Sequence, residues 1–172
     1  TLKLVNRLVE PSSGRIYVNG QDIMRLAVEK LRRKIGYVIQ NTGLFPHYTV
    51  EENIAVVPRL LNWKKDKVKN AIKEIIGKVY LPESILHKYP NQLSGGQQQR
   101  VGLARALVTD PPVVLMDEPL GALDPITRKL IRKEFKTLEA IRDKTVILVT
   151  HDVEEAFELA DRICLMDKGA IQ

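Results

Sequence analysis

The chain has 172 residues, of which 44% are hydrophobic and 28% charged, and its formal net charge is +6. This length fits one domain with room for an inserted subdomain, and the composition is that of a folded protein with a hydrophobic core rather than a disordered one. No run of residues approaches the roughly 20 apolar positions of a membrane-spanning helix. Aromatic residues make up 5% and do not alternate with basic ones, so we do not expect the positive charge to serve nucleic-acid binding.

The N-terminal residues predict a short helix followed by a strand. Residues 2–8 have the pattern of a helix end, and Pro11 and Gly14 stop it. Residues 15–18 predict a short strand that enters a turn at Asn19 and Gly20. A second strand is expected over residues 35–40.

The middle of the chain, from about residue 43 to residue 107, is typical of helices. Thr49 and Glu52 have the spacing of a capping box, so a helix should begin there. Apolar residues recur at helical spacing over residues 66–79, and the lysines of that segment are expected on its exposed face.

The last third alternates between strands and helices. Residues 113–117 form an apolar run typical of a strand buried on both faces. Asp124 and Pro125 are a typical helix start, and the helix is expected to continue to about residue 141. We further expect a buried strand at 145–150, a helix at 152–159 and a strand at 162–166. The whole pattern predicts an α/β fold with a largely parallel sheet.

Residues 93–100 carry a helix start suited to anions. Ser94 is a good N-cap, and Gln97 three residues later completes a capping box. Gly95 and Gly96 leave backbone N–H groups uncovered at the end of the helix where anions are favoured. This turn is therefore built like a phosphate clamp, although the same residues also fit an ordinary capped helix.

Two consecutive carboxylates end the predicted strand at 113–117. Ligands bind at the carboxyl ends of strands in open α/β sheets, so Asp117 is placed to hold Mg²⁺. Glu118 points elsewhere and can act as a general base toward water. The alternative is a cap or a surface pair.

His151 and Gln40 each follow a predicted strand. His151 comes after the strand at 145–150 and before a helix, a position where a catalytic side chain belongs. Gln40 ends the strand at 35–40, and its amide oxygen is a suitable metal ligand. For His47 and His87 we expect structural roles.

Taken in order, these segments resemble the motifs of ATP-binding-cassette (ABC) ATPases. Gln40 resembles the Q-loop glutamine, residues 93–97 the signature motif, and residues 113–118 the Walker B strand. Residues 119–124 are similar to the D-loop, and His151 to the switch histidine. The resemblance covers essentially the whole chain. It implies an α/β P-loop NTPase (RecA-like) core made of residues 1–42 and 108–172, with an inserted α-helical subdomain at 43–107.

The resemblance also implies roles for individual residues. ATP and Mg²⁺ are the implied cofactors, with Asp117 and Gln40 toward the metal. Glu118 is implied as the catalytic base, with His151 and Gln40 as further catalytic residues. In a head-to-tail dimer, Asp124 belongs to the D-loop at the interface, and the signature residues bind the ATP of the other copy. Those residues are Ser94, Gly95, Gly96 and Gln97.

The implied partners are a second ATPase subunit, a transmembrane permease and a solute-binding protein. The implied location is peripheral, at the cytoplasmic face of the inner membrane. Residues 4–8 and 56–61 are similar to ATPases of bacterial quaternary-amine importers for glycine betaine, choline or carnitine. Residues 43–48 expose Phe45 and Tyr48 as a rim for the permease, or else these rings pack beneath their loop.

One family motif does not occur in the chain. No Gly-x-x-x-x-Gly-Lys-Ser/Thr is present, and Thr1 to Lys3 resemble the helix that follows this phosphate-binding loop. We therefore expect the chain to begin just after the P-loop and to be incomplete at its N-terminus. Alone, it should bind ATP weakly and turn it over negligibly. The alternatives are a soluble ABC ATPase of DNA repair or translation, or a non-catalytic docking fragment.

Overall fold

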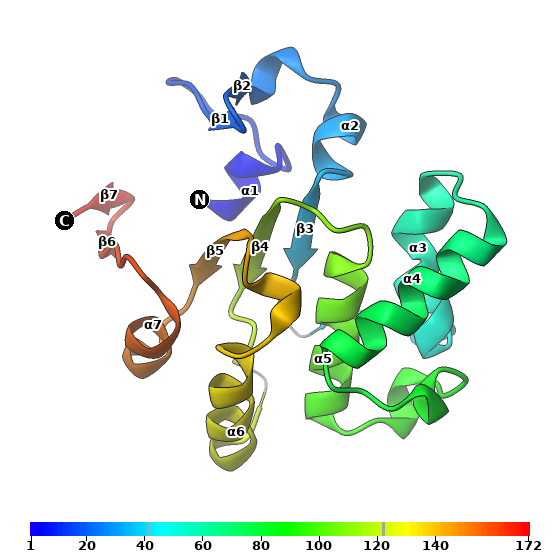
Figure 1. The fold of residues 1–172 in the computed structure, drawn as a ribbon. Coiled ribbons are helices and arrows are strands. Elements are labelled where there is room, and N and C mark those ends of the chain that lie inside the picture. Colours follow the sequence, from blue (N-terminus) through cyan, green and yellow to red (C-terminus); the bar gives the residue numbers. More distant parts are fainter. Residues whose placement is uncertain (41, 122) are drawn as a thin grey trace.

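The core of the protein is a parallel sheet of three strands. The computed structural model describes residues 1–40, 42–121 and 123–172, with the backbone alone for Glu139. Strands β3 (Ile35–Val38), β4 (Val113–Asp117) and β5 (Thr145–Val149) lie in the order β3-β4-β5, all parallel. Figure 1 shows the three strands pointing the same way, with their carboxyl ends together. The α/β fold expected from the sequence is confirmed.

One face of this sheet is covered by the N-terminal segment. Helices α1 (Leu2–Val5) and α2 (Val28–Arg32) and the short helix η1 (Ile23–Arg25) pack on it. Their buried side chains meet the residues of the sheet that point to the same side. This cluster comprises Leu2, Ile23, Leu31, Ile35, Val113 and Leu115.

The opposite face packs on the helices of the middle segment. These are α3 (Val50–Leu60), α4 (Lys65–Lys78) and α5 (Gly95–Leu107), with the short helices η2 (Glu83–Ile85) and η3 (Pro90–Gln92). Helix α5 lies between the sheet and the pair α3 and α4 (Figure 1). Val114 and Met116 of β4 belong to the same buried cluster as the apolar faces of these helices. The middle segment therefore shares its core with the sheet.

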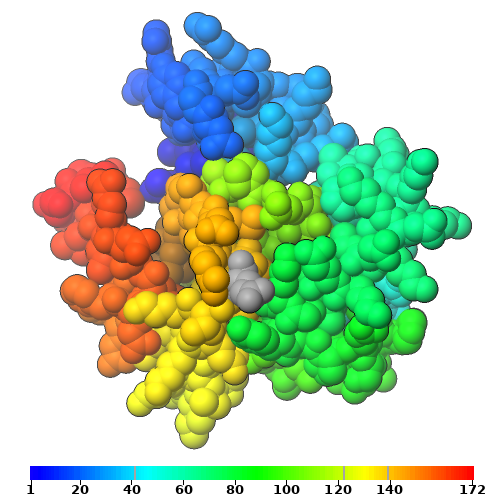
Figure 2. Space-filling model, in the orientation of Figure 1, coloured from blue at the N-terminus to red at the C-terminus, as the bar shows by residue number. Residues whose placement is uncertain are grey.

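The C-terminal helices α6 (Pro125–Phe135) and α7 (Val153–Leu159) come after the carboxyl ends of β4 and β5. The short helix η4 (Glu139–Ile141) packs on α4 and leads into the start of β5. Two small antiparallel hairpins complete the fold, β1 (Tyr17–Val18) with β2 (Gln21–Asp22) and β6 (Met166–Asp167) with β7 (Ala170–Ile171). Figure 2 shows the N-terminal residues in blue at one end and the C-terminal residues in red on the side opposite the green helices.

The predicted helix starts are confirmed by their caps. The Thr49 hydroxyl accepts from the Glu52 amide at 3.2 Å, and the Thr49 amide donates to the Glu52 carboxylate at 2.9 Å. The carboxylate of Asp124 accepts from two amides at the start of α6. Within the described residues, no helix combines the length and the apolar character needed to cross a membrane.

Two expected helix ends are wrong. Helix α1 stops at Val5, because Arg7 adopts a left-handed conformation with φ 52°. Helix α6 stops at Phe135 rather than near residue 141, and the hydroxyl of Thr137 donates to the carbonyl of Glu134. A threonine that bonds the backbone in this way competes with the helical ladder.

Two expected strands also differ from the structure. Strand β5 is at the edge of the sheet and is exposed at both ends rather than buried on both faces. Residues 162–165 form no strand, and Leu165 is 69% exposed. Only Met166–Asp167 pairs, in the terminal hairpin. Apolar composition alone did not distinguish a buried strand from an exposed connection.

Gly36 and Gly77 provide a matched test of this packing. A Cβ at Gly36 would lie 2.6 Å from the carbonyl oxygen of Ala106, so Gly36→Ala should lower the free energy of unfolding by about 1–3 kcal/mol. A Cβ at Gly77 in α4 would meet no atom within 4 Å, so Gly77→Ala should raise it by about 0.5–1 kcal/mol. Urea denaturation measures both. Equal effects at the two positions would contradict the close approach of β3 and α5.

Candidate functional site

Three polar side chains meet where the three strands end. Gln40 follows β3, Glu118 follows β4, and His151 follows β5. The Gln40 amide nitrogen donates to Glu118 Oε2 at 2.9 Å, and His151 Nδ1 lies 3.1 Å from Glu118 Oε1. The structure thus brings together three residues that the sequence predicted as catalytic, with Glu118 in the middle.

The backbone at Glu118 directs its side chain into this cluster. Glu118 has φ 45°, a left-handed conformation that costs on the order of 1–3 kcal/mol for a residue with a side chain. Its amide donates to the Val149 carbonyl at 2.8 Å, and its carbonyl accepts from the Gly121 amide at 3.1 Å. These two bonds hold the turn between β4 and the following loop.

Asp117 lies beside the cluster but belongs to the other face of the sheet. Its carboxylate is near the Tyr37 hydroxyl, and burial together with the Asp117 charge and hydrogen bond raises the Tyr37 pKa. The alternation of side chains along β4 accounts for this separation from Glu118. Two consecutive carboxylates therefore have different surroundings, as the sequence predicted.

The acidic and amide groups here fit a magnesium ion that is shared with phosphates. In residues 1–40, 42–121 and 123–172, no group of three or more His, Cys, Asp or Glu side chains could hold an ion by itself. Mg²⁺ commonly takes one or two carboxylates and completes its shell with water and substrate phosphates. One carboxylate, Asp117, and one side-chain amide, Gln40, are oxygen donors of that kind.

The signature residues form the expected capping box at the start of α5. The Ser94 hydroxyl accepts from the Gln97 amide at 3.3 Å, and the Ser94 amide donates to the Gln97 side chain at 3.0 Å. No hydrogen bond or ion pair between described residues joins this turn to Glu118, Gln40 or His151. Among the described residues, the signature turn therefore makes no direct polar contact with the cluster around Glu118.

The two signature glycines have different neighbours. A Cβ at Gly96 would lie 3.0 Å from Ile131 Cδ1 of α6, so Gly96 permits the close packing of α5 and α6. A Cβ at Gly95 would lie 3.5 Å from Leu123 Cδ2, an ordinary contact. Gly96 thus has a structural role within the chain that the sequence did not suggest.

The loop after Glu118 leads into α6, and Asp124 caps that helix. Its carboxylate accepts from the amides of Ile126 and Thr127 at 3.1 and 3.0 Å, and the hydrogen bonds from Thr127 lower the Asp124 pKa. Arg128 donates to the Leu123 carbonyl at 3.0 Å and supports the same loop. Ala122, which the sequence assigned to the D-loop, lies outside the described residues, as does Asn41.

A buried carboxyl group supports the segment of His151. Glu155 of α7 is 2% exposed and accepts from the Thr150 hydroxyl at 2.5 Å, while that hydroxyl accepts from the Asp152 amide. Burial raises the Glu155 pKa, and the hydrogen bond from Thr150 opposes this effect only in part. Glu155 therefore holds the residues on both sides of His151.

The loop after Gln40 is held from two helices. Asn53 of α3 is fully buried and makes four hydrogen bonds with the backbone of residues 45–49. Arg105 of α5 donates to the carbonyls of Thr42 and Gly43 at 2.9 and 2.7 Å. Phe45 is 41% exposed and contacts the rings of His47 and Tyr48.

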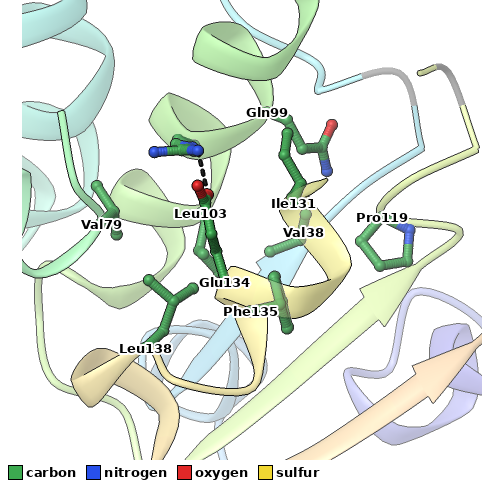
Figure 3. A pocket seen from close by; sticks show the side chains of 10 residues that line it. Val38, Val79, Gln99, Leu103, Pro119, Ile131, Glu134, Phe135 and Leu138 are labelled. Carbon is green, nitrogen blue, oxygen red and sulfur yellow. Dashed lines mark hydrogen bonds and ion pairs between the residues drawn. The ribbon is translucent and has the colours of Figure 1, made fainter. Parts of the chain in front are cut away.

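A small cavity between α5 and α6 is separate from the polar cluster. Its volume is about 10 Å³, and apolar side chains from both helices and from Val38 line it (Figure 3). The ion pair between Arg100 and Glu134 closes one side. This cavity is a gap in the packing of α5 on α6, not a ligand site.

Sequence reasoning missed several supporting residues, all polar. Asn53, Arg105 and Glu155 are separated from the chemical motifs and contact the loops that carry them. Asn53 lies on the apolar face of α3 between Val50 and Ile54, and a polar residue at such a position is a usable signal. Arg105 likewise interrupts the apolar end of α5.

Comparison with known proteins agrees with this arrangement. The ABC transporter family matches residues 1–121. The glycine betaine/carnitine/choline transport ATP-binding protein OpuCA of Bacillus subtilis is 53% identical, over 99% of this chain and 45% of that protein. The glycine betaine uptake system ATP-binding protein YehX of Escherichia coli is 50% identical, over 99% and 56%. A dimeric ATP-binding cassette in a post-hydrolysis state, bound to ADP and Pi, matches with a TM-score of 0.75 and 36% identity, over 91% and 71%.

The chain therefore belongs to the ABC transporter family. Its fold is that of the ATP-binding cassettes, as the resemblance of its motifs predicted. It spans about half the length of the two relatives named above.

The raised pKa of Glu155 predicts a dependence of stability on pH. A carboxyl group whose pKa is higher in the folded protein than its ordinary value of 4.5 binds protons preferentially in the folded state. Its contribution to stability is present below pH 4.5 and decreases as the pH rises through the folded pKa. Glu155→Gln lacks this titration, so the stability of the variant relative to the wild type should increase over the same range. Urea denaturation at pH 4 to 8 measures this, and a difference independent of pH would contradict it.

Proposed function

We propose that this chain is part of the ATP-hydrolysing subunit of an ABC importer. The observation that carries the proposal is the contact of Gln40 and His151 with the two oxygens of Glu118 at the carboxyl end of the sheet. A carboxylate held by an amide and an imidazole, next to a second carboxylate, is suited to directing water at a phosphate.

Glu118 accepts the proton of the attacking water in this proposal. Its side chain is 27% exposed, so water reaches it, and the hydrogen bond from Gln40 fixes one of its oxygens. His151 is 69% exposed and is positioned to donate to a γ-phosphate. Asp117 and the amide oxygen of Gln40 would hold Mg²⁺, which neutralises phosphate charge when bound.

The signature turn supplies the second half of the site, in a head-to-tail dimer. The start of α5 is the end of the helix where anions bind favourably. It carries the amides of Gly95 and Gly96 and the hydroxyl of Ser94. Their separation from Glu118 within one chain is expected if they contact the ATP held by a second copy. Asp124 and its neighbours in the D-loop would lie at the same interface.

The transported solute and the remaining partners are inferred from the relatives. Proteins about half identical to this chain are named for transport of glycine betaine, carnitine and choline. We infer a quaternary-amine osmoprotectant as the solute, with a transmembrane permease and a solute-binding protein as partners. The ATPase would lie peripherally at the cytoplasmic face of the membrane, with half-exposed Phe45 toward the permease. The division into a core, 1–42 and 108–172, and a helical subdomain, 43–107, remains part of this proposal.

Removing the general base is the direct test. Glu118→Gln in the natural protein that carries these residues should lower the rate of ATP hydrolysis by roughly 10²-fold or more and leave ATP binding intact. Phosphate release and calorimetric titration with Mg²⁺-ATP measure the two effects. The exposed Glu158→Gln in α7 is the control and should hydrolyse ATP at the wild-type rate.

Wild-type hydrolysis that persists in Glu118→Gln would exclude the proposed base. The same titration on the 172-residue chain alone tests the expectation of weak ATP binding. Micromolar affinity would show that the motifs present suffice without a Gly-x-x-x-x-Gly-Lys-Ser/Thr sequence. Absence of hydrolysis in the wild type would favour a role in docking or dimerisation.

Substitutions at the two signature glycines distinguish an effect on ATP-dependent dimerisation from an effect on the stability of the fold. Gly95→Ala should leave the free energy of unfolding within about 0.5 kcal/mol of the wild type, because the added methyl makes an ordinary contact. It should weaken ATP-dependent dimerisation by roughly tenfold, the scale of one lost hydrogen bond to a charged group. Gly96→Ala should weaken dimerisation and also destabilise the fold by about 1 kcal/mol, through Ile131. Sedimentation with ATP in a Glu118→Gln background measures dimerisation, and unchanged dimers in Gly95→Ala would contradict the proposal.

A further inference from the structure

Arg105 joins the signature helix to the loop that follows Gln40. It lies in the last turn of α5, whose first turn is the signature. Its two terminal nitrogens donate to the carbonyls of Gly43 and Thr42 at 2.7 and 2.9 Å, and the guanidinium carbon is 5.9 Å from the centre of the Phe45 ring. No carboxylate among the described residues pairs with it. Its two hydrogen bonds therefore both go to the backbone of this loop.

The backbone of the loop is shaped to present these carbonyls. Thr42 and Gly43 have φ values of 60° and 51°, so two consecutive residues are left-handed. The loop also approaches α5 closely at Gly102, where an added Cβ would lie 3.4 Å from the Thr42 carbonyl oxygen. Such a turn is unfavourable for Thr42, and it presents two consecutive carbonyls to Arg105. The fork of donors in Arg105 satisfies both.

The far end of the loop is attached to a different helix. Asn53 of α3 accepts from the Phe45 amide and donates to the carbonyls of Phe45 and Tyr48. Arg105 therefore controls the end that is close to Gln40, and Asn53 the end with the aromatic rings. Loss of Arg105 would leave the loop attached at one end only, so all of residues 42–48 would open more often.

We propose that Arg105 is a positioning residue that keeps Gln40 on Glu118 by holding the loop after Gln40 to the signature helix. Thr42 is only two positions after Gln40, so the position of the Thr42 carbonyl limits where the Gln40 side chain reaches. The link connects the end of α5 opposite the signature turn to the loop that follows Gln40. This inference rests on the proposed function for its effect on catalysis and on geometry alone for its effect on the loop.

Hydrogen exchange of the 172-residue chain tests the geometric part without any ATP hydrolysis. In Arg105→Ala, amides of residues 42–48 should exchange roughly tenfold faster, and those of residues 94–99 should not change. Arg100→Ala is the matched control. It removes an arginine from the same helix that pairs with Glu134 and bonds the Tyr80 carbonyl, and it should leave residues 42–48 unchanged.

The conservative variant Arg105→Lys distinguishes a local effect on the loop from a general loss of folding. The ammonium of Arg105→Lys keeps the charge but lacks the planar fork, so exchange at residues 42–48 should rise by less than in Arg105→Ala. Unchanged exchange in folded Arg105→Ala overturns the proposal. A uniform increase over all helices in both Arg105→Ala and Arg105→Lys also overturns it, since Arg105 would then serve only global stability.

Kinetics of the natural protein test the catalytic part. Arg105→Ala should lower kcat by roughly 10- to 100-fold and leave KM for ATP within about twofold, because a misplaced group costs rate rather than binding. The double variant Arg105→Ala, Gln40→Ala should be no slower than Gln40→Ala. If the kcat losses of Arg105→Ala and Gln40→Ala multiply in the double variant, Arg105 does not act through Gln40, and the proposal is overturned. Absence of hydrolysis in the wild type would refute the proposed function, and the exchange measurement would still decide the role of Arg105.

Discussion

The burial of β4 on both faces is the constraint on which the rest of the structure depends. Val114, Leu115 and Met116 are fully buried, with the N-terminal helices on one side and α5 with its neighbours on the other. A strand in this position tolerates charge only where it leaves the core, and Asp117 and Glu118 occupy that point. Because β3 and β5 run parallel to β4 on its two sides, their ends deliver Gln40 and His151 to the same edge.

The cluster at this edge depends on polar residues that lie further from it. Glu118 adopts an unfavourable backbone conformation, and hydrogen bonds to Val149 and Gly121 hold it there. Glu155 fixes the segment of His151, while Asn53 fixes the far end of the loop after Gln40. A buried polar group that is hydrogen-bonded restricts the loop it contacts, and Asn53 does so with four bonds and Glu155 with one.

Local patterns predicted much of the fold and of the site. The capping boxes at Thr49 and Ser94 were confirmed because a cap depends on residues three positions apart in sequence. The exposure of β5 was not predicted, since it depends on neighbours distant in the chain, and the end of α6 was missed because the local bond of Thr137 to Glu134 was not recognised. The same limit explains Glu155 and Arg105, whose roles require knowledge of which loop packs against each helix. The motif order pointed to Gln40, Glu118 and His151, but it does not reveal that both oxygens of Glu118 have partners.

The length of α5 sets how far a small motion at one end is carried to the other. From Gly95 to Arg105 the helix axis covers about 15 Å, at 1.5 Å per residue. Arg105 anchors one end to a loop at the sheet, so a tilt of about 10° around that anchor displaces the signature turn by about 3 Å. Such a displacement equals a hydrogen-bond length, so the proposed contacts between the turn and a phosphate depend on how firmly this end of the helix is held. The guanidinium of Arg105 thus links the end of α5 opposite the signature turn to the loop after Gln40.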